Sequence, residues 1–142
     1  MIQILSGIQN TTAALDAERT RLDVISENIA NANSMHGLDG KPYQRRVVVF
    51  ENALQQALDT NTGAPIGSLR VARIEKDSRP PLQVYEPGHP EADARGMVSM
   101  PNINIHEEMA DMIAASRAFE ANLAVVKNAR TMAMQTLAIG KR

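Results

Sequence analysis

Histidine and carboxylate side chains come closest to a metal-ligand spacing in the segment GHPEAD, where His89, Glu91 and Asp93 alternate. A loop that binds a hard cation usually supplies more carboxylates at alternate positions. The other two histidines, His36 and His106, lie far from this segment in the sequence. A turn with solvated polar side chains is therefore the better interpretation, and we predict no metal site.

A second acidic cluster, formed by Glu107, Glu108 and Asp111, has the residue types that acid–base catalysis uses. These residues stand at the start of a predicted helix, where carboxylates stabilise the positive end of the helix dipole. The sequence contains no glycine-rich phosphate loop, no nucleophile elbow and no pair of histidines on one helix. We therefore predict no catalytic residue and no cofactor, and we do not expect an enzyme.

Binding of a small ligand or of nucleic acid is not indicated either. Met109, Met112, Met132 and Met134 follow a helical spacing, which more often marks a core or a subunit interface than a cofactor site. The segment YQRRVVVFE mixes basic and aromatic residues, but the net charge is −1 and the chain has only two Tyr and two Phe. A β-strand explains this segment better than stacking on nucleic acid.

The first element that carries these residues is a predicted helix from Met1 to about Asn33. Its apolar residues recur every seven positions and form a narrow stripe. The stripe consists of Met1, Ile8, Leu15, Leu22 and Ile29, flanked by Ile4, Leu5, Ile25 and Ala32. The opposite side carries Gln9, Asp16, Glu18, Arg19, Asp23 and Glu27. A helix with so few apolar residues needs a partner.

A predicted C-terminal helix supplies that partner. Asn104 can cap its start with Glu107 three residues later, and Gly140 marks its end. Its stripe consists of Ile105, Met112, Phe119 and Val126, with Met109, Leu123 and Leu137 at the four-residue offset. We expect the two terminal helices to pair as an antiparallel coiled coil.

The C-terminal helix has a second apolar line, one position behind the first. This line consists of Ala118, Val125, Met132 and Ile139. One partner helix covers a stripe about 100° wide, so part of the apolar surface is left for other subunits. The alternative is that the insert or the N-terminal helix wraps over this line.

The middle of the chain reads as a small β-rich insert, so the expected fold is mainly α with residues 1–35, 36–100 and 101–142 as its three parts. We predict strands at about 46–51, 68–75 and 81–86, a short helix over NALQQALD (52–59) and a loop over TNTGAPIG (60–67). The segment EPGHPEADARG is predicted to be a turn, and the insert is expected to project from one end of the helix pair.

Three asparagines, Asn28, Asn31 and Asn33, close the N-terminal helix in the segment NIANANS. Asparagine suits a helix end, but one Gly or Asn usually suffices to stop a helix. Asn28 and Asn31 lie three positions apart on one face, and each amide offers two donors and an acceptor. We predict that this pair hydrogen-bonds the backbone of a neighbouring chain in a crowded interface.

The segment RLDVISENIANANS resembles the N-terminal signature of bacterial flagellar axial proteins. The segments GKPYQRRVVVFE and PGHPEADARGMV, together with the C-terminal part from MPNINIHEEM onward, are most similar to the proximal rod proteins of the flagellar basal body. The resemblance implies a structural subunit that polymerises with copies of itself and with other rod subunits into a tube. In that tube the terminal helices would surround the export channel and the inserts would face outward.

The resemblance also implies a location in the periplasmic rod, reached through the flagellar type III export apparatus. The first 25 residues lack a basic segment and a long apolar run, so we expect neither a cleaved signal peptide nor membrane insertion. The subunit interface is predicted to include Ile8, Leu15, Leu22, Ile25, Asn28, Ile29, Asn31, Asn33, Ile105, Met109, Met112, Phe119, Leu123, Val126, Met132 and Ile139. The alternative function is a free helical adaptor or export chaperone that binds partner helices.

Overall fold

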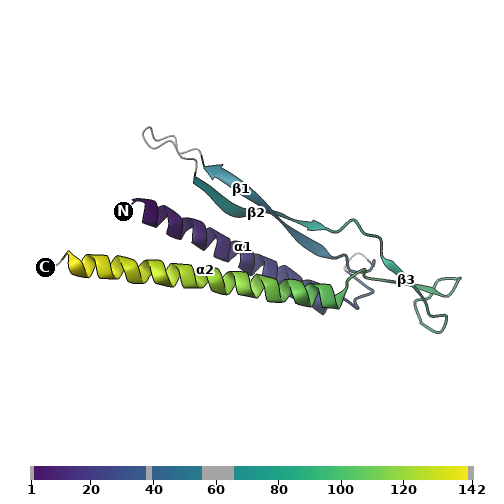
Figure 1. The fold of residues 1–142 in the computed structure, drawn as a ribbon. Coiled ribbons are helices and arrows are strands. Elements are labelled where there is room, and N and C mark those ends of the chain that lie inside the picture. Colours follow the sequence, from purple (N-terminus) through teal and green to yellow (C-terminus); the bar gives the residue numbers. More distant parts are fainter. Residues whose placement is uncertain (1, 38–39, 56–65, 141–142) are drawn as a thin grey trace.

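The computed structural model describes residues 2–37, 40–55 and 66–140, with side chains for 7–37, 40–51 and 70–140. Two long antiparallel helices place both termini at the same end, and two short β-hairpins connect them (Figure 1). The elements are α1 (Ile2–Ala30), β1 (Arg46–Gln55), β2 (Ile66–Lys76), β3 (Leu82–Tyr85), β4 (Met97–Met100) and α2 (Ile105–Ile139). The prediction of a mainly helical protein with a small β insert is confirmed.

The predicted ends of α2 are confirmed. Asn104 has an extended backbone, and its Oδ1 accepts a hydrogen bond from the backbone N–H of His106 at 3.0 Å. Its Nδ2 donates to Glu107 Oε1 at 3.3 Å, so the expected capping pair meets through its side chains. At the other end, the N–H of Gly140 donates to the carbonyl of Thr136 at 3.1 Å.

Helix α1 ends at Ala30, a few residues before the predicted end, and lies between α2 and the β1–β2 hairpin. Its solvent-exposed line consists of Gln9, Thr12, Asp16, Arg19, Asp23, Ser26 and Ala30. Two acidic residues predicted on this side turn away from it. Glu18 is mostly buried and lies 3.9 Å from Arg21, while Glu27 pairs with Arg46 of β1 at 2.9 Å. The β1–β2 hairpin therefore covers a face of α1 that was predicted to be exposed to solvent.

Strands β1 and β2 pair antiparallel from Arg46 opposite Lys76 to Gln55 opposite Ile66, with a bulge between Val49 and Phe50. The prediction of a helix over 52–59 is therefore wrong at 52–55, which belong to β1, and its remainder lies outside the described residues. Likewise, 66–67 of the predicted loop belong to β2. The strand conformation of these residues comes from their pairing across β1 and β2, and local propensity is a weak guide to such pairing.

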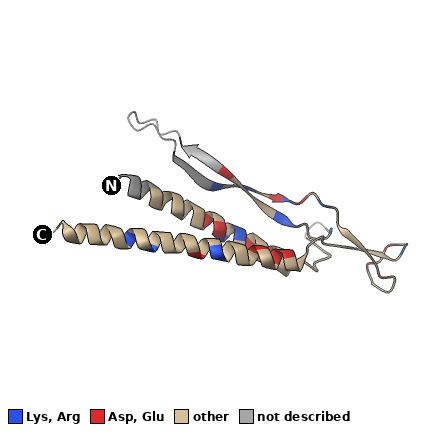
Figure 2. Ribbon diagram, viewed as in Figure 1, with Lys and Arg blue, Asp and Glu red and all other residues tan. Residues whose placement is uncertain are grey.

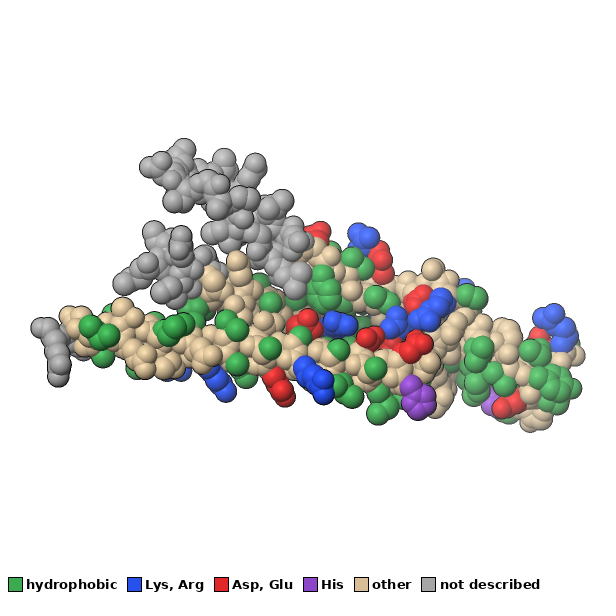
Figure 3. Space-filling view, in the orientation of Figure 1, with side chains coloured by type: hydrophobic (Ala, Val, Ile, Leu, Met, Phe, Trp, Pro, Cys, Tyr) green, Lys and Arg blue, Asp and Glu red, His purple; other side chains and the backbone are tan. Residues whose placement is uncertain are grey.

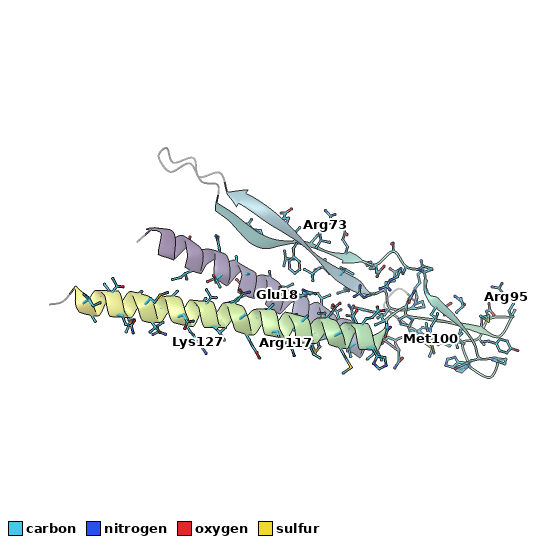
Figure 4. All side chains as sticks on the ribbon, in the orientation of Figure 1. Glu18, Arg73, Arg95, Met100, Arg117 and Lys127 are labelled. Atoms are coloured by element: carbon cyan, nitrogen blue, oxygen red, sulfur yellow. The ribbon has the colours of Figure 1, made fainter. Side chains whose placement is uncertain are left out.

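The placement of the insert corrects a second expectation. The β1–β2 hairpin folds back and contacts α1, whereas the β3–β4 hairpin extends past the ends of the two helices (Figure 1). Only the second hairpin projects from the end of the pair as expected. The outer side of the first hairpin carries Arg73, which points away from α1 (Figure 4). The first hairpin therefore widens the helix pair instead of extending it.

Strand β4 was not predicted, because its four residues follow a segment read as one turn. Leu82 pairs with Met100 and Val84 with Val98, which is fully buried. The carboxylate of Asp93 closes the connecting loop by accepting the backbone N–H groups of Arg95 and Met97, at 2.8 and 2.9 Å. These hydrogen bonds hold the pKa of Asp93 below its ordinary value.

The side of α2 that faces α1 follows an alternating spacing of three and four residues, as a coiled-coil seam does. It consists of Glu108, Met112, Ala115, Phe119, Asn122, Val126, Ala129 and Ala133, all buried or half-buried. Met112, Phe119 and Val126 are thus on the predicted stripe. Their companions are small or polar residues, whereas Met109 and Leu123, predicted at the offset, are exposed.

Gly96 has a φ of 74°, and an added Cβ would lie 3.0 Å from the Tyr85 ring and 3.1 Å from Pro87 Cβ. We predict that Gly96→Ala destabilises the β3–β4 hairpin by about 1 to 2 kcal/mol, because an L side chain is strained at this φ. Native-state hydrogen exchange at the Val98 amide measures the effect. The matched control is Gly88→Ala in the same loop, where an added Cβ meets nothing within 4 Å. Equal exchange in both variants would contradict the prediction.

Candidate subunit-docking surface and its buried polar junction

The side-chain amide of Asn28, near the end of α1, is 1% exposed and joins the first residue of β1. Its Oδ1 accepts the backbone N–H of Arg46 at 2.9 Å, and its Nδ2 donates to the carbonyl of Arg46 at 2.9 Å. Tyr43 Oη donates to Oδ1 at 3.1 Å, and Nδ2 also donates to Glu108 Oε2 at 3.0 Å. The amide therefore makes four hydrogen bonds and holds two other segments against α1.

Glu108, in the first turn of α2, is also 1% exposed and supplies the negative charge of this junction. Arg45 Nε donates to its Oε1 at 2.6 Å, so each carboxylate oxygen has a partner. The same guanidinium lies 3.6 Å from Asp77 and 3.7 Å from Asp111. A buried carboxylate needs such a paired and hydrogen-bonded cation to offset its loss of hydration.

The rim of the junction is held by further charged pairs. Asp77 accepts from the backbone and the guanidinium of Arg79, and these hydrogen bonds lower the pKa of Asp77. The backbone N–H of Asp77 donates to the carbonyl of Arg45 at 2.7 Å, which links the end of β2 to the junction. Burial, followed by the negative charge of Glu27, raises the pKa of Tyr43. Tyr43 therefore stays a neutral hydrogen-bond donor at neutral pH.

Along α2, large apolar side chains are exposed on both sides of its seam with α1. One flank consists of Ile105, Met109, Leu123 and Met134, and the other consists of Val125, Met132 and Ile139. Figure 3 shows hydrophobic side chains along this helix and at the β3–β4 hairpin. Val125, Met132 and Ile139 are 54%, 60% and 77% exposed, so most of the second apolar line is uncovered within one chain, as predicted. The alternative that other parts of the chain wrap over these three residues is wrong.

Charge divides the helix pair into two unlike halves. Charged side chains gather toward the junction, while few lie among the described residues near the two termini (Figure 2). In the sequence, residues 1–15 and 131–140 contain no Asp, Glu, Lys or Arg. Arg117 and Lys127 project from the side of α2 that faces away from α1 (Figure 4). The described residues of these two uncharged segments are suited to contacts with apolar helix surfaces.

Comparison with known proteins identifies the family. The family model described as flagella basal body rod protein matches residues 8–34, and the model of the flagellar basal body rod FlgEFG protein C-terminal matches residues 94–139. The flagellar basal-body rod protein FlgC of Yersinia enterocolitica is 41% identical over 129 residues, which is 91% of this chain and 92% of the relative. The chain belongs to the FlgC family of flagellar basal-body rod proteins. FlgC of Salmonella typhimurium is 40% identical over the same shares, and FlgC of Borreliella burgdorferi is 39% identical over 96% of this chain and 97% of the relative.

In this FlgC-family chain, the asparagines predicted to bond a neighbouring subunit bond their own chain. Asn28 hydrogen-bonds the backbone N–H and carbonyl of Arg46. Asn31 Nδ2 donates to the carbonyl of Glu27 at 2.8 Å, and its Oδ1 accepts from Ser34 at 3.1 Å. Asn28 thus bonds the backbone of β1 in its own molecule, where a neighbouring chain was predicted.

The other predicted interface residues fall into three groups in the FlgC-family structure. Ile25 is fully buried. The half-buried residues are Ile8, Leu15, Leu22, Ile29, Asn31, Met112, Phe119 and Val126. The exposed residues are Asn33, Ile105, Met109, Leu123, Met132 and Ile139. The exposed group is available to other subunits, and its role in docking remains a prediction.

Sequence reasoning missed the role of Glu108, which was assigned to the helix dipole, and did not single out Arg45. One signal was present, since Glu108 stands seven residues before Ala115 and four before Met112, on the same helix face. A charged residue on such a face needs a buried partner. The sequence pattern does not identify that partner, because Arg45 is 63 residues away in the chain.

The groups that could have done other chemistry have structural roles. His89 Nδ1 accepts the backbone N–H of Glu91 at 3.2 Å, and Glu91 lies 3.0 Å from His36 Nδ1. Within the described part of the chain, no three His, Asp or Glu side chains are grouped to hold a metal ion. The described helices include none with an apolar stretch that could span a membrane.

A groove of about 310 Å³ lies between α1, β1 and α2, beside the junction. Three arginines in its wall each face a carboxylate of the same chain. These pairs are Arg21 with Asp111, Arg45 with Glu108, and Arg46 with Glu27. Because their charges are matched within the chain, the groove offers little free positive charge to an anionic ligand.

We predict that Asn28→Asp lowers the free energy of unfolding by about 3 kcal/mol, because it removes two donated hydrogen bonds and places a second carboxylate against buried Glu108. Urea unfolding followed by circular dichroism measures the loss. Asn33→Asp is the matched control, since it adds the same charge at the same end of α1 on an exposed residue. A loss in Asn28→Asp no larger than in the control would contradict the prediction.

Proposed function

We propose that this protein is a structural subunit of the flagellar proximal rod, polymerising with copies of itself and other rod subunits into the tubular drive shaft. The shaft transmits torque and surrounds the export channel. Membership of the FlgC family supports the rod assignment. The observation that carries the polymerisation is the presence of uncovered apolar residues on both flanks of α2, because one flank alone would suit a dimer and two suit a larger array.

The energy for assembly would come from these flanks. Burial of one exposed aliphatic side chain contributes about 1.5 to 3 kcal/mol. Several such residues lie on each flank, so a neighbour on either side gains enough to offset part of the cost of association. Met132, Met134 and Ile139 lie in the segment 131–140, which has no charged residue, so contacts there would not require the desolvation of a charge.

We propose that α1 and α2 pair as an antiparallel coiled coil. The support is the alternating three- and four-residue spacing of the α2 seam and its contact with α1 along the pair. Ala115, Ala129 and Ala133 in this seam let the two backbones approach closely. Met112, Phe119 and Val126 fill the rest of the seam, while other large apolar side chains of α2 stand on the flanks.

Passage through the flagellar type III export apparatus is consistent with the small core. The fully buried hydrophobic residues of the described part of the chain are Ala17, Val24, Ile25, Ala32, Val98 and Ala115. Three of these six are alanines, so burial within one subunit contributes modestly to stability. Unfolding before export would therefore cost little, and assembly would supply the remaining stabilisation.

A substitution on the exposed flank separates assembly from folding. We predict that Val125→Asp changes the free energy of unfolding of the isolated subunit by about 0.5 kcal/mol or less, because the side chain is 54% exposed. The same variant should prevent incorporation into basal bodies and abolish swimming, because assembly would bury the new charge. Immunoblots of purified basal bodies and a swimming assay measure these effects.

Ala124→Asp is the matched control, because it places the same charge on an exposed position of α2 that faces away from the flank. Its helix neighbours at three and four positions are Glu120, Ala121, Lys127 and Asn128, none of which belongs to either flank. The control strain should assemble rods and swim. A Val125→Asp strain that swims normally would rule out this flank as a docking surface. A loss of unfolding free energy well above that of the control would place the defect in folding.

Hydrogen exchange distinguishes a rod subunit from the alternative of a free adaptor. We predict slow exchange near the junction, in residues 24–30 and 108–119, and fast exchange over 131–139, where the side chains are largely exposed. Exchange over 131–139 should slow in assembled rods. Strong protection of 131–139 in the dilute isolated chain would instead support a self-sufficient adaptor.

A further inference from the structure

The buried carboxylate of Glu108 has no role in the docking proposed above. It lies in the seam between α1 and α2, where the other described members of the α2 line are apolar apart from Asn122. An apolar residue at this position would avoid the desolvation of both Glu108 and Arg45. The presence of the ion pair therefore calls for a function other than stability.

The remaining seam does not define how the two helices align along their length. Its residues repeat at seven, so Ala115, Asn122 and Ala129 form one line and Met112, Phe119, Val126 and Ala133 form the other. Sliding α2 by seven residues replaces one small or apolar side chain by another along most of its length. Met112, Phe119 and Val126 differ in volume, but each is replaced by another apolar side chain, and apolar exchanges of this kind cost less than an unpaired buried charge.

The junction does discriminate between them. A slide of seven residues would bring Ala115 opposite Asn28, the place that Glu108 occupies, and would leave Arg45 without its 2.6 Å partner. Of its three carboxylate partners, the mostly buried Arg45 would lose Glu108 and Asp111, which belong to α2, and keep only Asp77 at 3.6 Å. Loss of the closest partner of a mostly buried charge is unfavourable. Asn28 Nδ2 would lose its bond to Glu108 at the same time. Only the observed alignment satisfies both groups.

We propose that the buried Glu108–Arg45 pair, held by Asn28, is the register lock of the helix pair, and that it selects one alignment of α1 and α2. Because Arg45 immediately precedes β1, the lock also ties the position of the β1–β2 hairpin to that alignment. The lock fixes where along the subunit the apolar flanks of α2 stand relative to α1.

The test replaces both charges by apolar residues of similar length, in the double variant Glu108→Met with Arg45→Met. The chain contains no cysteine, so spin labels can be attached to the exposed residues Asp23 and Lys127 after their substitution by cysteine. A slide of seven residues changes the axial separation of the labels by about 10 Å, since a helix rises about 1.5 Å per residue. Double electron–electron resonance measures the distance distribution.

We expect one narrow distance in the parent chain. The double variant should keep its helical circular dichroism and gain a second population about 10 Å shorter. The matched control is Glu27→Met with Arg46→Met, which removes a half-exposed ion pair outside the seam and should keep the single distance. A single unchanged distance in the folded Glu108–Arg45 variant would overturn the proposal. Loss of helical signal in that variant would also overturn it, because the pair would then be required for folding itself.

Discussion

The amide of Asn28 and the backbone of Arg46 exchange two hydrogen bonds, as two facing residues of antiparallel strands do. A buried peptide group must find a partner, and the start of β1 finds it in a side chain instead of a strand. This contact fixes where the chain leaves α1. The carboxylate of Glu108 then attaches the first turn of α2 to the same amide. The two helices and the first hairpin therefore meet at one small polar cluster, and the apolar contacts extend outward from it.

The parts of the fold that could be predicted are those with local causes. The helix cap at Asn104 and the seven-residue repeats of both helices follow from neighbouring residues, and both helices are present. The pairing of Glu108 with Arg45 could not be predicted in the same way, because the two residues are 63 positions apart and meet only in the folded chain. The helix predicted over Asn52–Gln55 was wrong for a related reason. The strand conformation of this segment depends on the facing strand β2, and its own composition suits a helix equally well.

The distribution of side-chain sizes on α2 is the reverse of that in most globular cores. Ala115 is completely buried, while Met132 and Ile139 are mostly exposed. Folding of one chain thus uses alanines for close approach of the helices and leaves several large apolar residues exposed. In the assembly proposed above, neighbouring subunits would cover these exposed residues. Hydrophobic periodicity placed Met112, Phe119 and Val126 in the seam, but it also assigned Met109 and Leu123 to that side, and these two are exposed.

The unequal lengths of the helices have a geometric consequence. Helix α2 has 35 residues and α1 has 29, and the tip of α2 extends beyond α1 at the end that carries both termini (Figure 1). The opposite end carries the polar junction and the β3–β4 hairpin. One end is therefore a bare single helix and the other is a broad, charged head. Subunits with such different ends that stack head to tail form a filament with a direction, whereas subunits joined head to head do not. A head-to-tail rod would therefore inherit its polarity from the shape of the single subunit.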